Sequence, residues 1–129
     1  MSAAKILIID DEPGFSTMTK LFLESGGEHF EVECESDSRQ ALQKARDCSP
    51  DLILLDIVMP HLDGGDVKAL LAEDPVLKKI PVLFLTSMVS QDDNGEGPFI
   101  RSGGNVMLSK TTPPDVLKGC IQDKIDGRI

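Results

Sequence analysis

A run of four apolar residues, Leu52–Leu55, constrains the fold of this chain more than any other feature. The run has no polar face, which is typical of a strand buried on both sides in a parallel sheet that helices cover. It ends at Asp56, and Met59 and Pro60 then turn the chain away. Asp56 is therefore predicted to stand at the carboxyl end of a central strand. Whether it is a functional carboxylate or only caps the loop cannot be decided from this stretch alone.

Four further segments have the pattern of strands. Ala4–Asp10 is a second apolar run that ends in an acid, whereas Phe30–Glu35 alternates apolar and acidic residues and is predicted to lie at an edge of the sheet. The other two are Pro81–Leu85 and Asn105–Ser109. Helical spacing of apolar residues separates the strands: from Pro13 to the glycines at 26–27, from Ala41 to Cys48, from about Gly64 to Glu73, and from Pro113 to Ile125.

This order of segments predicts an α/β fold with a parallel sheet, right-handed crossovers and helices on both faces. With the alternating strand at the edge, the natural arrangement is a flavodoxin-like, doubly wound (βα)5 three-layer sandwich with parallel strand order 2-1-3-4-5. A chain of 129 residues has the length of one domain, so residues 1–129 are expected to form a single domain. The ligand crevice of this topology lies at the carboxyl ends of the first and third strands, where Asp10, Asp11 and Asp56 stand.

Composition narrows the range of partners. The net charge of −9 argues against direct binding to nucleic acid or to an anionic membrane, because both would repel the chain. Three widely spaced cysteines suit a reducing compartment and give no metal framework. Neither a signal peptide nor an apolar run long enough to span a bilayer is present in the sequence, so a cytoplasmic location is expected.

Three carboxylates that converge on one crevice repel each other and raise the proton affinity of at least one of them. A bound cation relieves this repulsion, and ligation by oxygen atoms alone suits Mg²⁺, which typically takes one or two carboxylates together with water and phosphate oxygens. The sequence has no glycine-rich phosphate loop, so the phosphate is expected to arrive on a partner or a small donor. Mg²⁺ is therefore the predicted cofactor.

Two more side chains are predicted to reach this crevice. The fourth and fifth strands lie beside the third, so Thr86 and Lys110, which follow them, come close to Asp56. A carboxylate nucleophile, a metal, a hydroxyl and a fixed cation are what phosphoryl transfer to an aspartate requires. Each residue alone is a weak signal, because a threonine at a strand end is usually structural and a lone lysine is usually solvated. Their joint placement carries the prediction.

The sequence resembles the receiver domain of two-component response regulators over essentially its whole length. Four motifs carry the resemblance, in the order and approximate spacing of the family: IIDDEP at 8–13, LLDIVMPHLDG at 54–64, FLTS at 84–87 and LSK at 108–110. The resemblance implies that Asp56 accepts a phosphoryl group, that Asp11 binds Mg²⁺ directly and that Asp10 acts chiefly through water. The other implied contacts are the carbonyl of Val58 to the metal and, to the phosphoryl oxygens, Thr86, Lys110 and the amides of Val58 and Ser87.

The sequence departs from the family pattern in three places. The family usually has an aromatic switch residue where this chain has Met107, and a thioether repacks without the fixed shape of a ring. Thr111 stands where proline is usual, which puts in doubt the cis peptide bond expected before it. The stretch Gln91–Gly104 replaces the usual fourth helix and is rich in glycine, so we expect only a short or irregular helix there.

The resemblance implies a signalling switch and not an enzyme acting on a separate substrate. A histidine kinase or phosphotransfer protein would donate the phosphoryl group, and the domain would catalyse only its own phosphorylation and dephosphorylation. The altered surface would then bind a downstream protein, with homodimer formation left open and no output domain in this chain. One alternative is a pseudo-receiver that acts as a constitutive interaction module. Another is an aspartyl-phosphate hydrolase, which commonly needs a second acid where Val58 stands.

Overall fold

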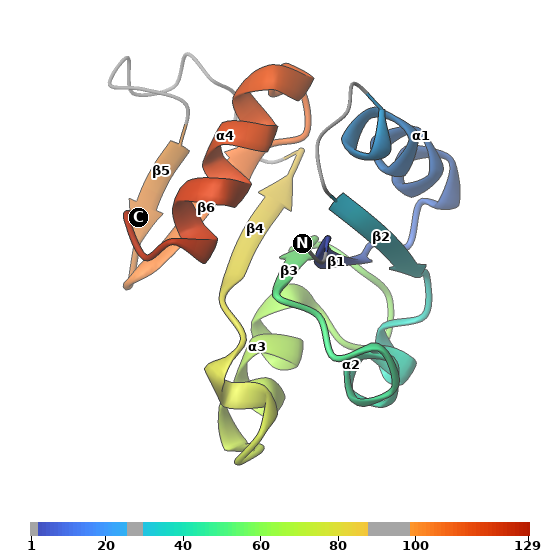
Figure 1. Cartoon of the computed structure of the whole chain (residues 1–129). Helices are drawn as coiled ribbons and strands as arrows, with labels where there is room; N and C mark the ends of the chain where they lie inside the picture. Colours follow the sequence, from blue (N-terminus) through green and yellow to red (C-terminus); the bar gives the residue numbers. More distant parts are fainter. Residues whose placement is uncertain (1–2, 26–29, 88–98) are drawn as a thin grey trace.

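The computed structural model describes residues 3–25, 30–87 and 99–129. Within these ranges the chain forms a mixed sheet with α-helices on both of its faces (Figure 1). The strands are β1 Ala4–Ile9, β2 Phe30–Glu35, β3 Leu52–Leu55, β4 Val82–Thr86, β5 Phe99–Ser102 and β6 Asn105–Ser109. The helices are α1 Pro13–Glu24, α2 Ala41–Cys48, α3 Gly64–Glu73 and α4 Pro114–Ile125, with short 3-10 turns η1 Ser38–Gln40 and η2 Leu77–Lys79.

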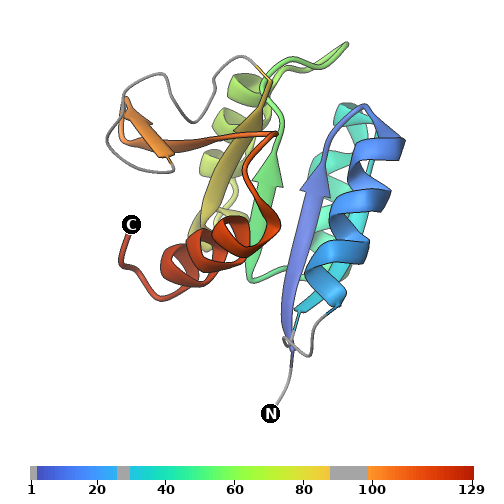
Figure 2. The same cartoon turned by 90° about the horizontal axis from the view of Figure 1, so that it is seen from above.

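The strand order is β2-β1-β3-β4-β6-β5. The first five of these strands are parallel and stand in the order that the sequence predicts, with the alternating strand β2 at one edge. In Figure 2 the arrows of β1 and β3 run side by side in the same direction. The carboxyl ends of the central strands therefore meet at one end of the sheet.

The other edge of the sheet differs from the prediction. Residues 99–102 form β5, which pairs antiparallel with β6, so the expectation of a short or irregular helix is wrong for this part of Gln91–Gly104. Gly103 and Gly104 have φ values of 57° and 81° and connect the two strands as a tight turn, which requires the left-handed conformation that glycine adopts without steric cost. Residues 91–98 of the same prediction lie outside the described ranges.

Two apolar layers hold the sheet between its helices. Alternate residues of each central strand face opposite sides, so Ile6 and Ile8 contact the layer under α1 and α4, whereas Leu7 and Ile9 contact the layer under α2 and α3. This is why the central strands have no polar face in the sequence. Among the helices of the described ranges, none combines the length and the apolar character needed to cross a membrane.

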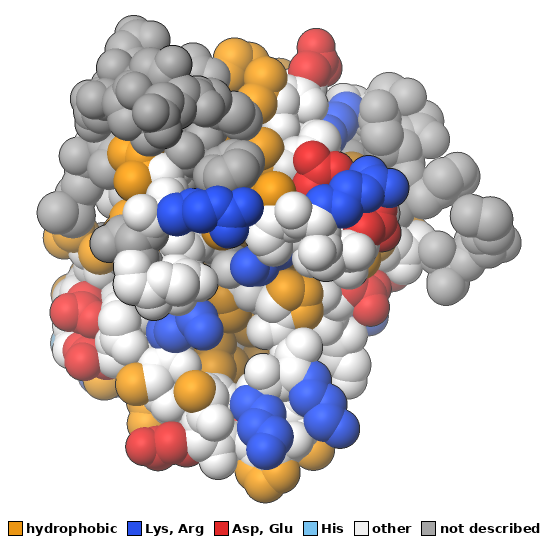
Figure 3. All heavy atoms as spheres, turned by 90° about the vertical axis from the view of Figure 1, so that its left-hand side faces the viewer, with side chains coloured by type: hydrophobic (Ala, Val, Ile, Leu, Met, Phe, Trp, Pro, Cys, Tyr) orange, Lys and Arg blue, Asp and Glu red, His pale blue; other side chains and the backbone are white. Residues whose placement is uncertain are grey.

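The charge of the molecule is unevenly distributed. Figure 3 shows Lys and Arg side chains spread over the face that lies at the left of Figure 1. Burial and the nearby cations Lys68 and Arg101 lower the pKa of Lys124, so positive side chains from α3, β5 and α4 lie near one another. A chain with a net charge of −9 thus keeps a locally basic region beside the β5 edge.

Candidate functional site

Backbone hydrogen bonds at the ends of β1 and β3 place two aspartates side by side. The Asp56 amide donates to the carbonyl of Ile9 at 2.9 Å, and the Asp10 amide donates to the carbonyl of Glu35 on β2 at 3.1 Å. Both side chains are nearly enclosed, with exposed fractions of 2% for Asp10 and 4% for Asp56. The sheet therefore holds two buried carboxylates where sequence reasoning expected them.

Asp11 completes an acidic cluster. Carboxylate oxygens of Asp10, Asp11 and Asp56 all lie within 4.8 Å of one another. Burial, and next the charge of Asp10, raises the pKa of Asp56 to about 6, and burial also raises the pKa of Asp10. Three oxygen donors at this spacing fit a hard divalent cation such as Mg²⁺, and the repulsion between them is the physical reason to bind one.

Lys110 connects β6 to this cluster, as predicted. Its Nζ atom lies 2.8 Å from Oδ2 of Asp10 and 3.4 Å from Oδ2 of Asp56. Burial alone would lower the pKa of Lys110, but the hydrogen bonds to its acidic partners raise it, so the ammonium stays charged. A fixed cation beside a buried carboxylate suits a reaction that builds negative charge there.

Two partners of Lys110 were not foreseen from the sequence. Oε1 of Glu12 is 2.7 Å from Nζ, and the ring centroid of Phe15 lies 4.7 Å from the same atom. Glu12 directly follows the acid pair in the IIDDEP motif, but the motif does not indicate its partner, and 98 residues separate it from Lys110. The alignment of β1 with β6 through two intervening strands brings them together, so only the strand order could have pointed to this contact.

The remaining predicted residues stand at the same end of the sheet. Thr86 ends β4 with a fully buried side chain, and its carbonyl accepts a hydrogen bond from the Lys110 amide at 3.0 Å. Ser87 follows Thr86 and is exposed. Val58 lies in the loop after β3 and is 61% exposed. These positions put the Val58 and Ser87 backbone beside the strand ends that carry Asp56 and Thr86.

The loop after Asp56 is held by Asp63 and Gly64. Asp63 caps α3 in a capping box, in which its side chain accepts from the Asp66 amide and the Asp66 side chain accepts from the Asp63 amide. The Gly64 amide donates to the carbonyl of Ile57 at 2.7 Å. A Cβ atom on Gly64 would lie 2.5 Å from the carbonyl oxygen of Asp56, so only glycine fits here.

Side-chain hydrogen bonds hold the turn after Lys110, where Thr111 stands at the usual proline position. Oγ of Ser109 accepts from the Thr111 amide at 3.1 Å and lies 2.7 Å from Oγ1 of Thr111, while the Thr112 hydroxyl donates to the carbonyl of Ser109 at 2.6 Å. No cis peptide bond occurs in the described part of the chain. Met107, at the usual aromatic position, is half-buried and packs against the core under α2 and α3.

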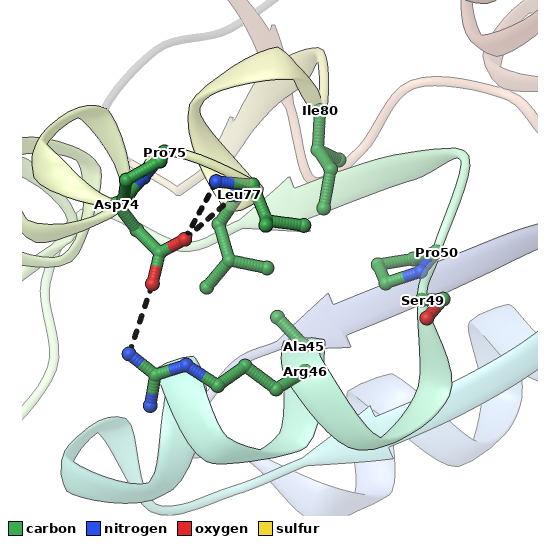
Figure 4. Close-up of a pocket in the computed structure, with 9 residues that line it drawn as sticks. Ala45, Arg46, Ser49, Pro50, Asp74, Pro75, Leu77 and Ile80 are labelled. Atoms are coloured by element: carbon green, nitrogen blue, oxygen red, sulfur yellow. Dashed lines mark hydrogen bonds and ion pairs between the residues drawn. The ribbon is translucent and has the colours of Figure 1, made fainter.

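A hollow of about 490 Å³ lies at the end of the sheet opposite to the acidic cluster (Figure 4). Its lining includes Pro50 and Ile80, which precede the amino ends of β3 and β4. Arg46 and Asp74 form an ion pair of 2.9 Å between its two sides, and the same Asp74 side chain accepts hydrogen bonds from the amides of Val76 and Leu77. This hollow is mostly apolar and contains no cluster of carboxylates.

Comparisons with known proteins agree with this geometry. The family model of the response regulator receiver domain matches residues 6–122. Response regulator Rre1 of Synechocystis sp. is 32% identical over 118 residues, which cover 92% of this chain and 50% of that protein. The transcriptional regulator RpaA of the same organism is 37% identical over 82% of this chain and 42% of its own length. The chain thus spans half or less of these relatives.

Solved structures give the same result. The chemotaxis protein CheY4 of Vibrio cholerae has a TM-score of 0.77 at 30% identity, with coverage of 95% of this chain and 99% of that chain. A putative response regulator from Chloroflexus aurantiacus has a TM-score of 0.78 at 26% identity, covering 97% and 99%. From the matched family model and these relatives, the chain belongs to the receiver domains of two-component response regulators.

Proposed function

We propose that this receiver accepts a phosphoryl group on Asp56 and changes its binding surface in response. The observation that carries the proposal is the buried Asp56 carboxylate, 4% exposed, with the Lys110 ammonium 3.4 Å away and the oxygens of Asp10 and Asp11 within 4.8 Å. A carboxylate oxygen of Asp56 attacks phosphorus and the bond from phosphorus to the donor breaks. The leaving group, a histidine imidazole or the anion of a small donor, departs with the electron pair.

Each neighbouring residue has a role in this step. Lys110 neutralises charge on the phosphoryl oxygens, and Thr86 donates its hydroxyl hydrogen to one of them. The amides of Val58 and Ser87 donate to the remaining oxygens. Asp10, Asp11 and Asp56, whose oxygens lie within 4.8 Å of one another, would hold Mg²⁺ together with the Val58 carbonyl. When bound, Mg²⁺ supplies charge neutralisation and orientation of the phosphoryl oxygens.

The partners follow from the same chemistry. Receiver domains work with histidine kinases or phosphotransfer proteins, and we propose that one of these is the physiological donor. The phosphorylated domain then binds a downstream protein, either alone or as a homodimer. We place this exchange in the cytoplasm, where such donors present their phosphohistidine. The negative net charge favours a protein over nucleic acid as the direct target.

The test is the intact mass of the protein after incubation with Mg²⁺ and acetyl phosphate, compared between the wild type and Asp56→Asn. We expect a phosphoryl adduct on the wild type that disappears in the variant and when EDTA replaces Mg²⁺. Absence of an adduct with acetyl phosphate and with a phosphorylated histidine donor would contradict the proposal and favour a constitutive interaction module. Steady release of phosphate without an adduct would instead indicate a hydrolase.

A further inference from the structure

We propose that Glu12 is a positioning residue for Lys110: it holds the ammonium at the mouth of the site while Asp56 is free, and it competes with the phosphoryl group for that ammonium afterwards. This inference rests on the proposed phosphorylation of Asp56 and adds a residue to that site. The carboxylate of Glu12 makes the shortest of the three contacts of Nζ with acids, 2.7 Å, compared with 2.8 Å to Asp10 and 3.4 Å to Asp56.

The backbone of Glu12 is fixed for this role. Its amide donates to Oδ1 of Asp10 at 2.9 Å, and its carbonyl accepts from the Ser16 amide at 3.1 Å. Glu12 occupies the N-cap position of α1, where a side chain normally accepts from the first amides of the helix, yet it makes no such bond. The Glu12 side chain contacts Lys110 instead. It does so although it is 63% exposed and water could solvate its carboxylate at little cost.

Glu12 and the phosphoryl group compete for Lys110 because several acids share its one ammonium group. When a cation occupies the acidic cluster, the charges of Asp10 and Asp56 are directed toward it, and their hold on Lys110 weakens. Glu12 lies outside the cluster and keeps its full attraction for Nζ. A phosphoryl group on Asp56 must therefore draw Lys110 away from Glu12 before the ammonium can neutralise its oxygens.

The first test needs no phosphorylation and uses the metal-free protein. The Phe15 ring lies against Nζ, so it marks the position of Lys110 by shifting the NMR signal of the adjacent ε protons, and Phe15→Leu calibrates that shift. We expect Glu12→Gln and Glu12→Asp to move the signal toward its Phe15→Leu position, and Glu35→Gln to leave it in place. An unchanged signal in both Glu12 variants would overturn the inference.

The second test measures the rate of adduct formation against acetyl phosphate concentration at saturating Mg²⁺. We expect Glu12→Gln to lower KM by about twofold to fivefold, the range of an exposed ion pair, with a smaller change in the maximal rate. Glu12→Asp keeps the charge but is one methylene shorter and favours capping its own helix, so it should lower KM as well. Glu35→Gln removes a carboxylate at the same end of the sheet without touching Lys110 and should behave as the wild type.

The variants separate the possible explanations. If Glu12→Gln lowers KM and Glu12→Asp does not, the carboxylate acts by repelling the anionic donor, and the inference is wrong. If the wild type forms no adduct, the proposed function fails, while the NMR comparison still decides whether Glu12 positions Lys110. Because Glu12 is exposed, its substitution is expected to leave the fold intact, and the amide spectrum of each variant checks this.

Discussion

Asp56 and Asp74 are the same residue type at opposite ends of the sheet, and their surroundings shift their pKa values in opposite directions. Hydrogen bonds from the Leu77 amide, Arg46 and the Val76 amide lower the pKa of Asp74, whose side chain is partly exposed. Asp56 accepts from the Ile57 amide at 2.9 Å, yet burial and Asp10 raise its pKa to about 6. The hydrogen bonds of Asp74 stabilise its charge and the fold, whereas the charge of Asp56 has fewer compensating contacts and gains from a new one.

The largest expected difference between the two aspartates is in phosphorylation. Asp56→Asn removes the attacking oxygen and should abolish the adduct formed from acetyl phosphate. Asp74→Asn, at the other end of β3 and β4, should form the adduct at a rate within about twofold of the wild type, because a lost exposed charge pair changes little at long range. Time courses of intact mass measure both. A tenfold loss in Asp74→Asn would mean that the two ends of the sheet are coupled.

The next largest difference is expected between Lys110 and Arg46, the cations of the two regions, in their effect on adduct formation. Lys110→Ala is expected to slow adduct formation about 100-fold, the effect of removing one preorganised charge contact, while Mg²⁺ affinity stays the same or rises because a competitor for Asp10 and Asp56 is gone. Arg46→Ala should change neither property. Single-turnover kinetics and a Mg²⁺ titration followed by NMR measure the two effects. A collapse of metal affinity in Lys110→Ala would show that Lys110 organises the metal site instead of the phosphoryl site.

Substitutions at Asp56 and at Asp74 should change the stability of the fold in opposite directions. In EDTA at pH 7, Asp56→Asn should raise the free energy of unfolding by about 1 to 2 kcal/mol, because it removes a poorly compensated buried charge. The pKa of Asp56 is raised in the folded state from 3.8 to about 6. The folded state therefore binds this proton more tightly, and the destabilisation is complete above pH 6 and disappears as the pH falls toward 3.8. Urea titrations of the wild type and Asp56→Asn from about pH 4 to about pH 8 test this, because that range brackets the titration of Asp56. A difference in the free energy of unfolding that stays constant over this range would contradict the prediction.

The smallest expected effect is the change in thermal stability when Asp74 or Arg46 is substituted. Asp74→Ala removes the acceptor for the Val76 and Leu77 amides and should lower the Tm by about 3 to 6 °C, as the loss of a cap does in a domain of this size. Arg46→Ala, which removes only the exposed partner of the ion pair, should lower it by less. Thermal unfolding followed by circular dichroism ranks the three proteins. Equal losses would assign the stabilisation to the ion pair instead of the capping bonds.

The sequence predicted the acidic end of the site well, for a physical reason. An uninterrupted apolar run is typical of a doubly buried strand, so the positions of Asp10 and Asp56 were predicted from Leu52–Leu55 and its counterpart before Asp10. The Glu12 contact was not predicted, because the IIDDEP motif does not indicate what the Glu12 side chain binds and its partner is 98 residues away. β5 was missed because its four residues precede two glycines, which indicate a break in a helix as readily as a hairpin turn.

The hairpin of β5 and β6 has a consequence for the order in which this domain folds. Its register pairs run from Ser102 with Asn105 to Phe99 with Leu108, so they lie three to nine residues apart. By contrast, β1 pairs with β3 across 46 residues, as the register of Ile6 with Leu52 shows. Closing a short loop loses much less chain entropy than closing a long one. The strand that carries Lys110 can therefore form early and locally, whereas the acids that this lysine neutralises meet only when the long-range parallel pairing is complete.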